Sequence, residues 1–402
     1  MKRVDAVILA GGYGSRILKV TKNKIPKPLL KINKKPLLDY LIQNLSKYNI
    51  NKIYIIAGHK GLLIKKKYQD KYQNLVQIKC ILEKKTLGTA YALNYIKNKI
   101  KNDFILVNGD TFVDFNLNYF FKKKINKFFV GCMVVTKDFK NSLTNNLLNL
   151  DIDKNKRIVF SKKNKFISSG IIFLRKKILK LINKKTFSLE NDILNKLIIE
   201  KKLRGIEHKG MFIDIGTPKN FLLAKKIIKK KTYRPAIFFD RDGVINYDHG
   251  YIHKIRDFKF KPQIIKTLKF FSNKNFYIFI VTNQSGIARG YYGINDFIKL
   301  QEHIKKKLLI KNIFLNDVVY CPHYKAGIVK EFSINCNCRK PKTGMVKYLK
   351  ENWTINIKKS LFIGDNKTDK MCAQRSNINF IFYNKNLYKK IKMMYKNDIK
   401  LQ

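Results

Sequence analysis

The chain has 402 residues, of which 45% are hydrophobic and 12% aromatic, enough apolar material for two domains. Its formal charge of +58 reflects 85 Lys and Arg residues against 27 Asp and Glu residues. Six cysteines in a chain of this size exclude a disulfide-dense secreted scaffold. The apolar segment at residues 4–9 is too brief for a signal peptide, and no run approaches the roughly 18 residues of a membrane span. The sequence therefore predicts a cytoplasmic protein with no membrane partner.

The positive charge is spread over both halves of the chain. Short lysine runs at 65–67, 122–124, 229–231 and 305–307 lie among Asn and Ile residues. A concentrated basic face would bind nucleic acid by releasing counterions, so a nucleic-acid-binding protein is the non-enzymatic alternative. No recognisable nucleic-acid-binding module accompanies the charge. The scatter favours compositional drift, and no specific nucleic-acid partner is expected.

The N-terminal half alternates predicted strands and helices. Buried strands are expected at residues 4–9, 52–57, 78–82 and 104–107, with helices at 37–48 and 88–100. This alternation predicts βαβ crossovers and a doubly wound α/β sheet. Strands at 128–135 and 168–174 extend the sheet with antiparallel pieces, and a helix at 219–231 closes the unit. The predicted N-terminal domain is residues 1–231.

A glycine-rich loop at residues 10–16 (AGGYGSR) follows the first strand. Gly11, Gly12 and Gly14 let backbone N–H groups approach a triphosphate, and Arg16 adds positive charge. A dinucleotide site would need an acidic residue at the end of the second strand, where residues 57–60 read AGHK. The loop therefore favours a nucleoside triphosphate.

Four more motifs follow this loop: residues 26–28 (PKP), 87–90 (LGTA), 108–110 (NGD) and 214–218 (DIGTP). Together these segments resemble the sugar-1-phosphate nucleotidyltransferase family, which has a GT-A-like, Rossmann-like fold. In that chemistry an anomeric phosphate oxygen attacks the α-phosphorus of the triphosphate, so catalysis is positioning plus charge neutralisation.

The resemblance implies roles for particular residues. Asp110 and Asp214 match the Mg²⁺ ligands, and Arg16 and Lys27 match the cations that neutralise phosphate. It also implies that Glu83, Gly88 and Glu190 lie near the base or the sugar. For these three residues a purely structural role is an equal alternative.

The C-terminal half shows a second, smaller α/β pattern after a linker at 232–235, where Pro235 disfavours helix at Arg234. Strands are expected from residue 236 and at 276–282, 317–320 and 360–363, with helices at 262–271, 295–309 and 344–350. This second doubly wound domain is predicted to span residues 236–402.

Two carboxylates, Asp240 and Asp242, stand just past the first of these strands, where open α/β sheets place their ligands. Gly243 lets the backbone turn behind them. One carboxylate can attack phosphorus while the other protonates the leaving alkoxide. The remaining parts come from other strand ends: Thr282 and Asn283 as hydrogen-bond donors, Lys340 as a cation, and Asp365 as a Mg²⁺ ligand.

Three segments carry a family resemblance: residues 240–246 (DRDGVIN), 281–291 (VTNQSGIARGY) and 338–345 (CRKPKTGM). They are similar to haloacid-dehalogenase-like phosphatases, and within these to the D-glycero-D-manno-heptose 1,7-bisphosphate 7-phosphatase family. The resemblance implies that Asp240 is the nucleophile and Asp242 the acid/base, with both joining Asp365 around Mg²⁺. Thr282 and Lys340 would hold the transferred phosphoryl group. Substrate-binding positions are implied at Asn283, Arg289 and Arg339.

Cys321, His323, Cys336 and Cys338 form a three-thiolate, one-imidazole set, the composition of a closed structural Zn²⁺ site. Histidinol-phosphate phosphatases share this set and the Asp pair, so the two features leave the substrate open.

Joined, the halves predict a bifunctional enzyme that removes the 7-phosphate of heptose 1,7-bisphosphate and activates the product with a nucleoside triphosphate. The family parallel favours the α-anomer and GTP, with GDP-D-glycero-α-D-manno-heptose as the expected product. The alternative is a mannose- or glucose-1-phosphate nucleotidyltransferase fused to a phosphatase of other specificity. The expected partners are phosphorylated sugars and a nucleotide. The sequence leaves the anomer, the base and a homo-oligomer open.

Overall fold

The computed structural model describes residues 3–122, 125–137, 149–163, 165–183 and 185–396. The chain divides into two compact units, residues 1–229 and 230–402. The predicted linker belongs to the second unit, because the Arg234 N–H donates to the Thr354 carbonyl and Arg234 forms a β-bridge with Ile355. Among the described residues, no helix is both long and apolar enough to span a membrane.

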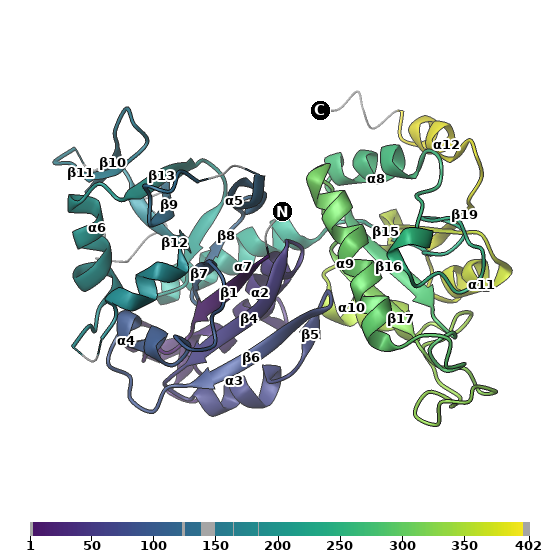
Figure 1. The fold of residues 1–402 in the computed structure, drawn as a ribbon, viewed down its shortest axis with the longest axis horizontal. Helices are drawn as coiled ribbons and strands as arrows, with labels where there is room; N and C mark the ends of the chain where they lie inside the picture. The colour runs from purple at the N-terminus through teal and green to yellow at the C-terminus, as the bar shows by residue number, and fades with distance from the viewer. Residues whose placement is uncertain (1–2, 123–124, 138–148, 164, 184, 397–402) are drawn as a thin grey trace. The chain divides into compact units, whose positions relative to one another are not determined.

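The first unit is built on an eight-stranded sheet in the order β13-β9-β12-β7-β1-β4-β6-β5 (Figure 1). Strand β1 (Val4–Leu9) lies between β4 (Ile50–Ala57) and β7 (Phe104–Asn108), parallel to both. The outer strands are β5 (Tyr72–Gln73), β6 (Val76–Leu82), β9 (Gly131–Thr136), β12 (Ile167–Leu174) and β13 (Leu203–His208). Strand β12 is antiparallel to β7 and β9, as predicted.

Short helices and three small ladders complete this unit. The ladders pair β2 (Lys31–Ile32) with β3 (Lys35–Pro36), β8 (Thr111–Val113) with β14 (Phe212–Asp214), and β10 (Leu150–Ile152) with β11 (Ile158–Phe160). The helices are α1 (Leu18–Thr21), α2 (Leu37–Ser46), α3 (Gly61–Tyr68), α4 (Thr89–Asn94), α5 (Asn118–Lys122), α6 (Asn195–Ile199) and α7 (Pro218–Thr232), which crosses the unit division. Short 3-10 helices are η1 (Ser15–Ile17), η2 (Lys27–Leu29) and η4 (Lys176–Leu181), and η5 (Leu189–Leu194) is a π-helix.

The second unit is a five-stranded parallel sheet in the order β17-β16-β15-β18-β19. Its strands are β15 (Ala236–Phe239), β16 (Tyr277–Asn283), β17 (Asp317–Cys321), β18 (Leu361–Gly364) and β19 (Asn379–Phe382). Its helices are α8 (Ile264–Asn273), α9 (Ile294–Ile310), α10 (Gly344–Asn352), α11 (Lys367–Arg375) and α12 (Leu387–Met394), with turns η6 (Ile255–Asp257) and η7 (Ile357–Lys359).

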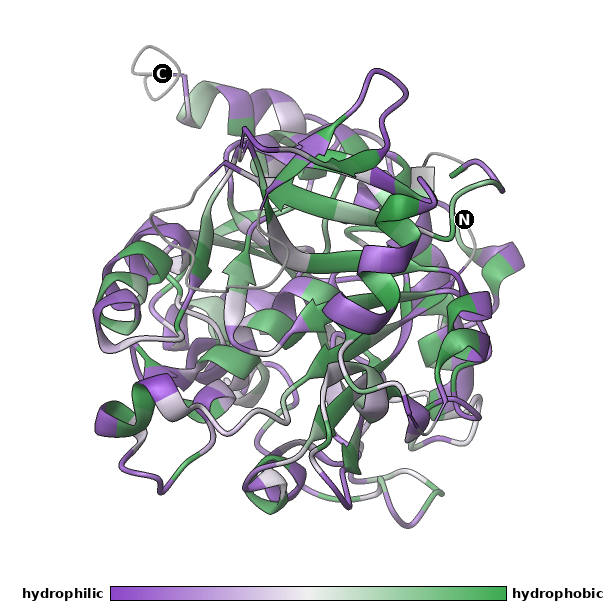
Figure 2. Cartoon of the chain, turned by 90° about the vertical axis from the view of Figure 1, so that its left-hand side faces the viewer, coloured by the Kyte–Doolittle hydropathy of each residue, from purple (hydrophilic) through white to green (hydrophobic). Residues whose placement is uncertain are grey.

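Continuous apolar runs explain the central strands. Ala236–Phe239 is fully buried, as a parallel strand covered on both faces should be. Figure 2 shows strands that are mainly hydrophobic and helices that carry hydrophobic and hydrophilic residues on different sides. The helix predicted at 88–100 is shorter than expected: α4 ends at Asn94, and the following residues form turns that still bury Ile96 and Ile100.

Candidate active sites

A buried lysine joins two carboxylates at the carboxyl edge of the second sheet. Lys340 Nζ lies 2.9 Å from Asp240 Oδ1 and 2.7 Å from Asp369 Oδ1, and the Lys340 side chain is 1% exposed. Burial disfavours the charge on Lys340, but the two carboxylates outweigh it and raise its pKa. Burial also raises the pKa of Asp240, to about 7, against the opposing effect of Lys340. A bound cation would favour the ionised form of Asp240.

The carboxylates of Asp240, Asp365 and Asp369 come within 4.8 Å of one another and suit Mg²⁺. This set departs from the predicted one, which held Asp242 in place of Asp369. The Asp242 carboxylate instead receives hydrogen bonds from Arg241 Nε (3.0 Å) and Nη2 (2.8 Å). Gly243 is required beside the group, because a Cβ there would collide with Asp365 Oδ2 and its φ is +76°.

Sequence reasoning missed Asp369. It lies on the first turn of α11, where its Oδ2 accepts from the backbone N–H groups of Asp365 and Asn366 at 3.2 and 3.1 Å. With Asn366 as the N-cap, it forms a capping box. The spacing Asn-x-x-Asp at residues 366–369 is a capping-box pattern, which predicts that a helix starts there. In such a box the Asp369 side chain turns back toward the N-cap, and therefore toward the end of β18.

Thr282 and Asn283 are the last two residues of β16, and their side chains make different contacts. Thr282 is buried and lines the cavity of about 670 Å³ that holds Asp240 and Asp365. Asn283 clamps the backbone of Lys340, because its Nδ2 donates to the Lys340 carbonyl (3.2 Å) and its Oδ1 accepts from the Lys340 N–H (3.0 Å). Asn283 also lines the cavity, so its predicted substrate contact stays a prediction beside this structural role.

The two arginines predicted to bind substrate flank one tyrosine. The guanidinium carbon of Arg289 lies 3.9 Å from the ring centroid of Tyr324, and that of Arg339 lies 5.4 Å from it. Arg339 lines the cavity, whereas Arg289 is not among its lining residues. Arg339 therefore reaches the cavity, whereas Arg289 packs on Tyr324 outside the cavity lining.

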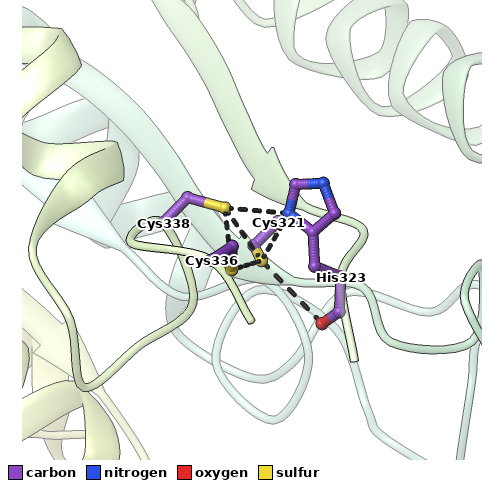
Figure 3. A group of neighbouring side chains, drawn as sticks. All are labelled: Cys321, His323, Cys336 and Cys338. Atoms are coloured by element: carbon purple, nitrogen blue, oxygen red, sulfur yellow. Dashed lines mark hydrogen bonds between the residues drawn. The ribbon is translucent and has the colours of Figure 1, made fainter. Parts of the chain in front are cut away.

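The three cysteines and the histidine converge as predicted (Figure 3). Their Sγ atoms lie 3.1–3.5 Å apart, and His323 Nδ1 is 3.2 Å from Cys338 Sγ. The pKa of Cys338 is lowered to about 5, first by its hydrogen bond with Cys321 and further by His323. A ready thiolate within a three-sulfur, one-nitrogen set fits Zn²⁺. Only Arg339 separates Cys338 from Lys340, so the cluster also positions the lysine.

In the first unit, both predicted cations and one of the two predicted metal-binding carboxylates line a cavity of about 320 Å³. Arg16, Lys27 and Asp110 line it together with the glycine-rich loop. Lys27 Nζ lies 2.5 Å from Asp110 Oδ2. Burial works to raise the pKa of Asp110, but Lys27 outweighs this and lowers it.

Asp214 lies beside Asp110, because strand pairing matches Asp214 with Thr111. Burial raises its pKa to about 6, and the Asp110 charge adds to the effect. Asp214 Oδ1 accepts from the Gly216 N–H at 2.6 Å, while the buried Oδ2 has no hydrogen-bond partner in the described part of the chain. Asp214 Oδ2 is thus a buried carboxylate oxygen without a hydrogen-bond donor among the described residues, and a second carboxylate, Asp110, lies nearby. This arrangement fits Mg²⁺, which Asp110 and Asp214 would hold.

The remaining predicted positions line the same cavity. Glu83 rests against Gly11, where any Cβ would collide with its Oε1, and burial raises the pKa of Glu83 to about 7. Gly88 has a φ of +124°, and a Cβ there would collide with the Phe187 carbonyl. Glu190 Oε2 accepts from Thr89 Oγ1 at 2.8 Å.

Comparison with known proteins agrees with this geometry. A family model described as nucleotidyl transferase matches residues 5–231, more than half of the 402 residues. The chain belongs to the nucleotidyl transferase family. A second model, described as polynucleotide kinase 3 phosphatase, matches residues 235–398. The nucleotidyl transferase part also aligns with the crystal structure of HddC from Yersinia pseudotuberculosis, at 27% identity over 56% of this chain and 99% of that one, with a TM-score of 0.47.

Relatives of the phosphatase part are more similar. The D-glycero-alpha-D-manno-heptose-1,7-bisphosphate 7-phosphatase of Campylobacter jejuni is 41% identical over 143 residues, which are 36% of this chain and 78% of that protein. The D-glycero-beta-D-manno-heptose-1,7-bisphosphate 7-phosphatase of Escherichia coli K12 is 40% identical over 144 residues, 36% of this chain and 75% of that protein. Alongside its nucleotidyl transferase part, the chain therefore carries a phosphatase of the heptose bisphosphate 7-phosphatase family, and it is an enzyme in both halves.

Proposed function

We propose that the enzyme hydrolyses the 7-phosphate of D-glycero-D-manno-heptose 1,7-bisphosphate and transfers a nucleotidyl group to the resulting heptose 1-phosphate. The observation that carries the proposal is the Asp240–Lys340–Asp369 arrangement, within a region about 40% identical to phosphatases of that bisphosphate. Those relatives include enzymes of both anomers, so either anomer is a substrate to be tested.

In the phosphatase site, an Asp240 oxygen attacks phosphorus and the bond to the sugar oxygen breaks. The leaving alkoxide takes a proton from Asp242. Asp242 then removes a proton from water, whose oxygen attacks the phosphoryl–Asp240 group, releasing inorganic phosphate and restoring Asp240. Lys340 balances charge on the phosphoryl oxygens and on Asp240. Mg²⁺, held by Asp240, Asp365 and Asp369, would supply further charge neutralisation when bound.

In the transferase site, an oxygen of the sugar 1-phosphate attacks the α-phosphorus of a triphosphate and pyrophosphate leaves. Arg16 and Lys27 neutralise charge on the phosphates, and the glycine-rich loop supplies close backbone approach. Mg²⁺ at Asp110 and Asp214 would add to that neutralisation.

Glu83 supports GTP as the nucleotide. Within the described residues no hydrogen bond or ion pair engages its carboxylate, which lines the cavity. An ionised carboxylate offers two acceptors and no donor. Guanine presents two adjacent donors, N1–H and N2–H, on its Watson–Crick edge, whereas the other bases pair a donor with an acceptor there. A Glu83 carboxylate that faces the base would therefore prefer guanine.

Two variants with complementary defects test the two-step function. Asp240→Asn should leave the bisphosphate unchanged, and added heptose 1-phosphate should restore nucleotide-heptose. Asp110→Asn should accumulate heptose 1-phosphate. A mixture of the two variants with bisphosphate and GTP should form GDP-heptose, followed by mass spectrometry. Formation of nucleotide-heptose from bisphosphate by Asp240→Asn alone at the wild-type rate would contradict the order of steps.

A further inference from the structure

Gln284, directly after β16, touches two groups with different proposed tasks. Its Nε2 lies 2.9 Å from Asp242 Oδ2 and 2.8 Å from Thr282 Oγ1. The side chain is 2% exposed and lines the cavity that holds Asp240. Gln284 Nε2 therefore contacts both the carboxylate of Asp242, the proposed acid/base, and the hydroxyl of Thr282, which lines the same cavity.

Tyr292 fixes which end of this amide faces Asp242. The Tyr292 hydroxyl donates to Gln284 Oε1 at 2.7 Å. Burial raises the pKa of Tyr292, so the hydroxyl stays protonated and available as a donor. The His253 ring stacks on the Tyr292 ring at a centroid distance of 4.7 Å and covers it. A reversed amide would point its oxygen at a carboxylate, so the NH₂ group belongs on the Asp242 side.

The orientation of the amide decides the roles of its two neighbours. An amide nitrogen only donates, so Thr282 Oγ1 accepts its bond and the hydroxyl proton is left for another acceptor. A phosphate in the cavity is such an acceptor. The second amide proton goes to Asp242 Oδ2, while Asn246 Nδ2 holds Oδ1 at 2.9 Å. Together with the hydrogen bonds from Arg241 Nε and Nη2, these contacts hold the Asp242 carboxylate at both oxygens.

We propose that Gln284, held by Tyr292, is a positioning residue of the phosphatase site. It orients Asp242 for proton transfer and makes the Thr282 hydroxyl a donor to the phosphate. The inference rests on the acid/base role proposed for Asp242, and it adds no bond-breaking step to the reaction.

Two phosphate esters separate positioning from simple folding. An alkyl leaving group needs the proton of Asp242, whereas p-nitrophenolate leaves as a stable anion. Gln284→Met keeps the length of the side chain and removes its donors. It should lower kcat/KM, which reports the first phosphoryl transfer and not the later hydrolysis common to both esters, by ~10²-fold on a sugar phosphate and far less on p-nitrophenyl phosphate. KM should rise for both esters, because Thr282 loses its fixed orientation. Tyr292→Phe should shift the same quantities in the same direction by a smaller factor.

The double variant should be no worse than Gln284→Met alone, because both changes break one chain of contacts. Unchanged zinc content and melting temperature should accompany the kinetic losses. Equal losses on the two esters, or none, would overturn the inference. Failure of the proposed substrate would look different: the wild type would then hydrolyse p-nitrophenyl phosphate but not heptose 1,7-bisphosphate. In that case the alkyl ester in the comparison would be the sugar phosphate that the wild type does hydrolyse.

Discussion

Glu83 is a carboxyl group whose charge changes near neutral pH. Burial raises its pKa to about 7, above the value of about 4.3 expected in an unfolded chain. The folded state therefore holds this proton more tightly than the unfolded state. Its contribution to the free energy of unfolding declines as pH rises from the unfolded pKa to the folded one. A ligand that needs the ionised form has the opposite preference.

Binding of GTP should therefore tighten with rising pH. If Glu83 accepts two protons from guanine, the dissociation constant should fall about tenfold between about pH 6 and about pH 8. Glu83→Gln should remove this dependence and weaken discrimination among nucleotides, as isothermal titration calorimetry can measure. Ionisation of the triphosphate itself is common to both proteins and cancels in the comparison. An identical pH profile in Glu83→Gln would mean that Glu83 does not contact the base.

Asp240 and Asp257 offer a matched pair of substitutions in the second unit. Asp240→Asn removes the proposed nucleophile and should lower phosphate release by at least ~10³-fold. Asp257, in η6, is exposed, so Asp257→Asn should release phosphate at the wild-type rate. Transferase activity on heptose 1-phosphate should be unchanged in both. Phosphate release that survives in Asp240→Asn would refute the assignment.

At the scale of the elements, the loop that joins β17 to α10 carries Lys340 and three members of the Cys/His cluster, and the fourth, Cys321, ends β17. Cys336→Ser should lower bound zinc, the melting temperature of the second unit and phosphatase activity together, because the free energy of metal binding contributes to folding. Cys80→Ser, a buried thiol on β6 of the first unit, should keep its zinc. Elemental analysis gives the metal content. Purified wild-type protein without stoichiometric zinc would contradict the prediction.

The sequence predicted elements well where their signal is local. Central strands such as Ala236–Phe239 are continuous apolar runs, and strand ends carry the polar motifs that the structure gathers into two sites. Side-chain partners were harder to foresee. Asp242 was expected beside Mg²⁺, but the fully buried Arg241 next to it binds its carboxylate. That choice depends on packing around Arg241, including the Phe297 ring 5.5 Å away, which no local pattern reveals.

At the scale of the whole molecule, the charge of +58 is the main reason to consider nucleic acid. If the charge is compositional drift, duplex DNA binding should be weak, indifferent to sequence and lost as salt rises. Fluorescence anisotropy at several salt concentrations measures this. Tight, sequence-selective binding at physiological salt would restore the alternative of a nucleic-acid-binding protein.

The metal cluster also shapes how this enzyme can evolve. Residues 324–335 lie between His323 and Cys336, so metal ligands bracket both ends of this segment. It carries Tyr324, which packs against both Arg289 and Arg339. A metal bound by these ligands would anchor both ends independently of what lies between them, and mutations within the segment would then change the surroundings of Arg289 and Arg339 without moving Lys340. Exchange of this one short segment would in that case be a route to a different sugar specificity that leaves the carboxylates of the site unchanged.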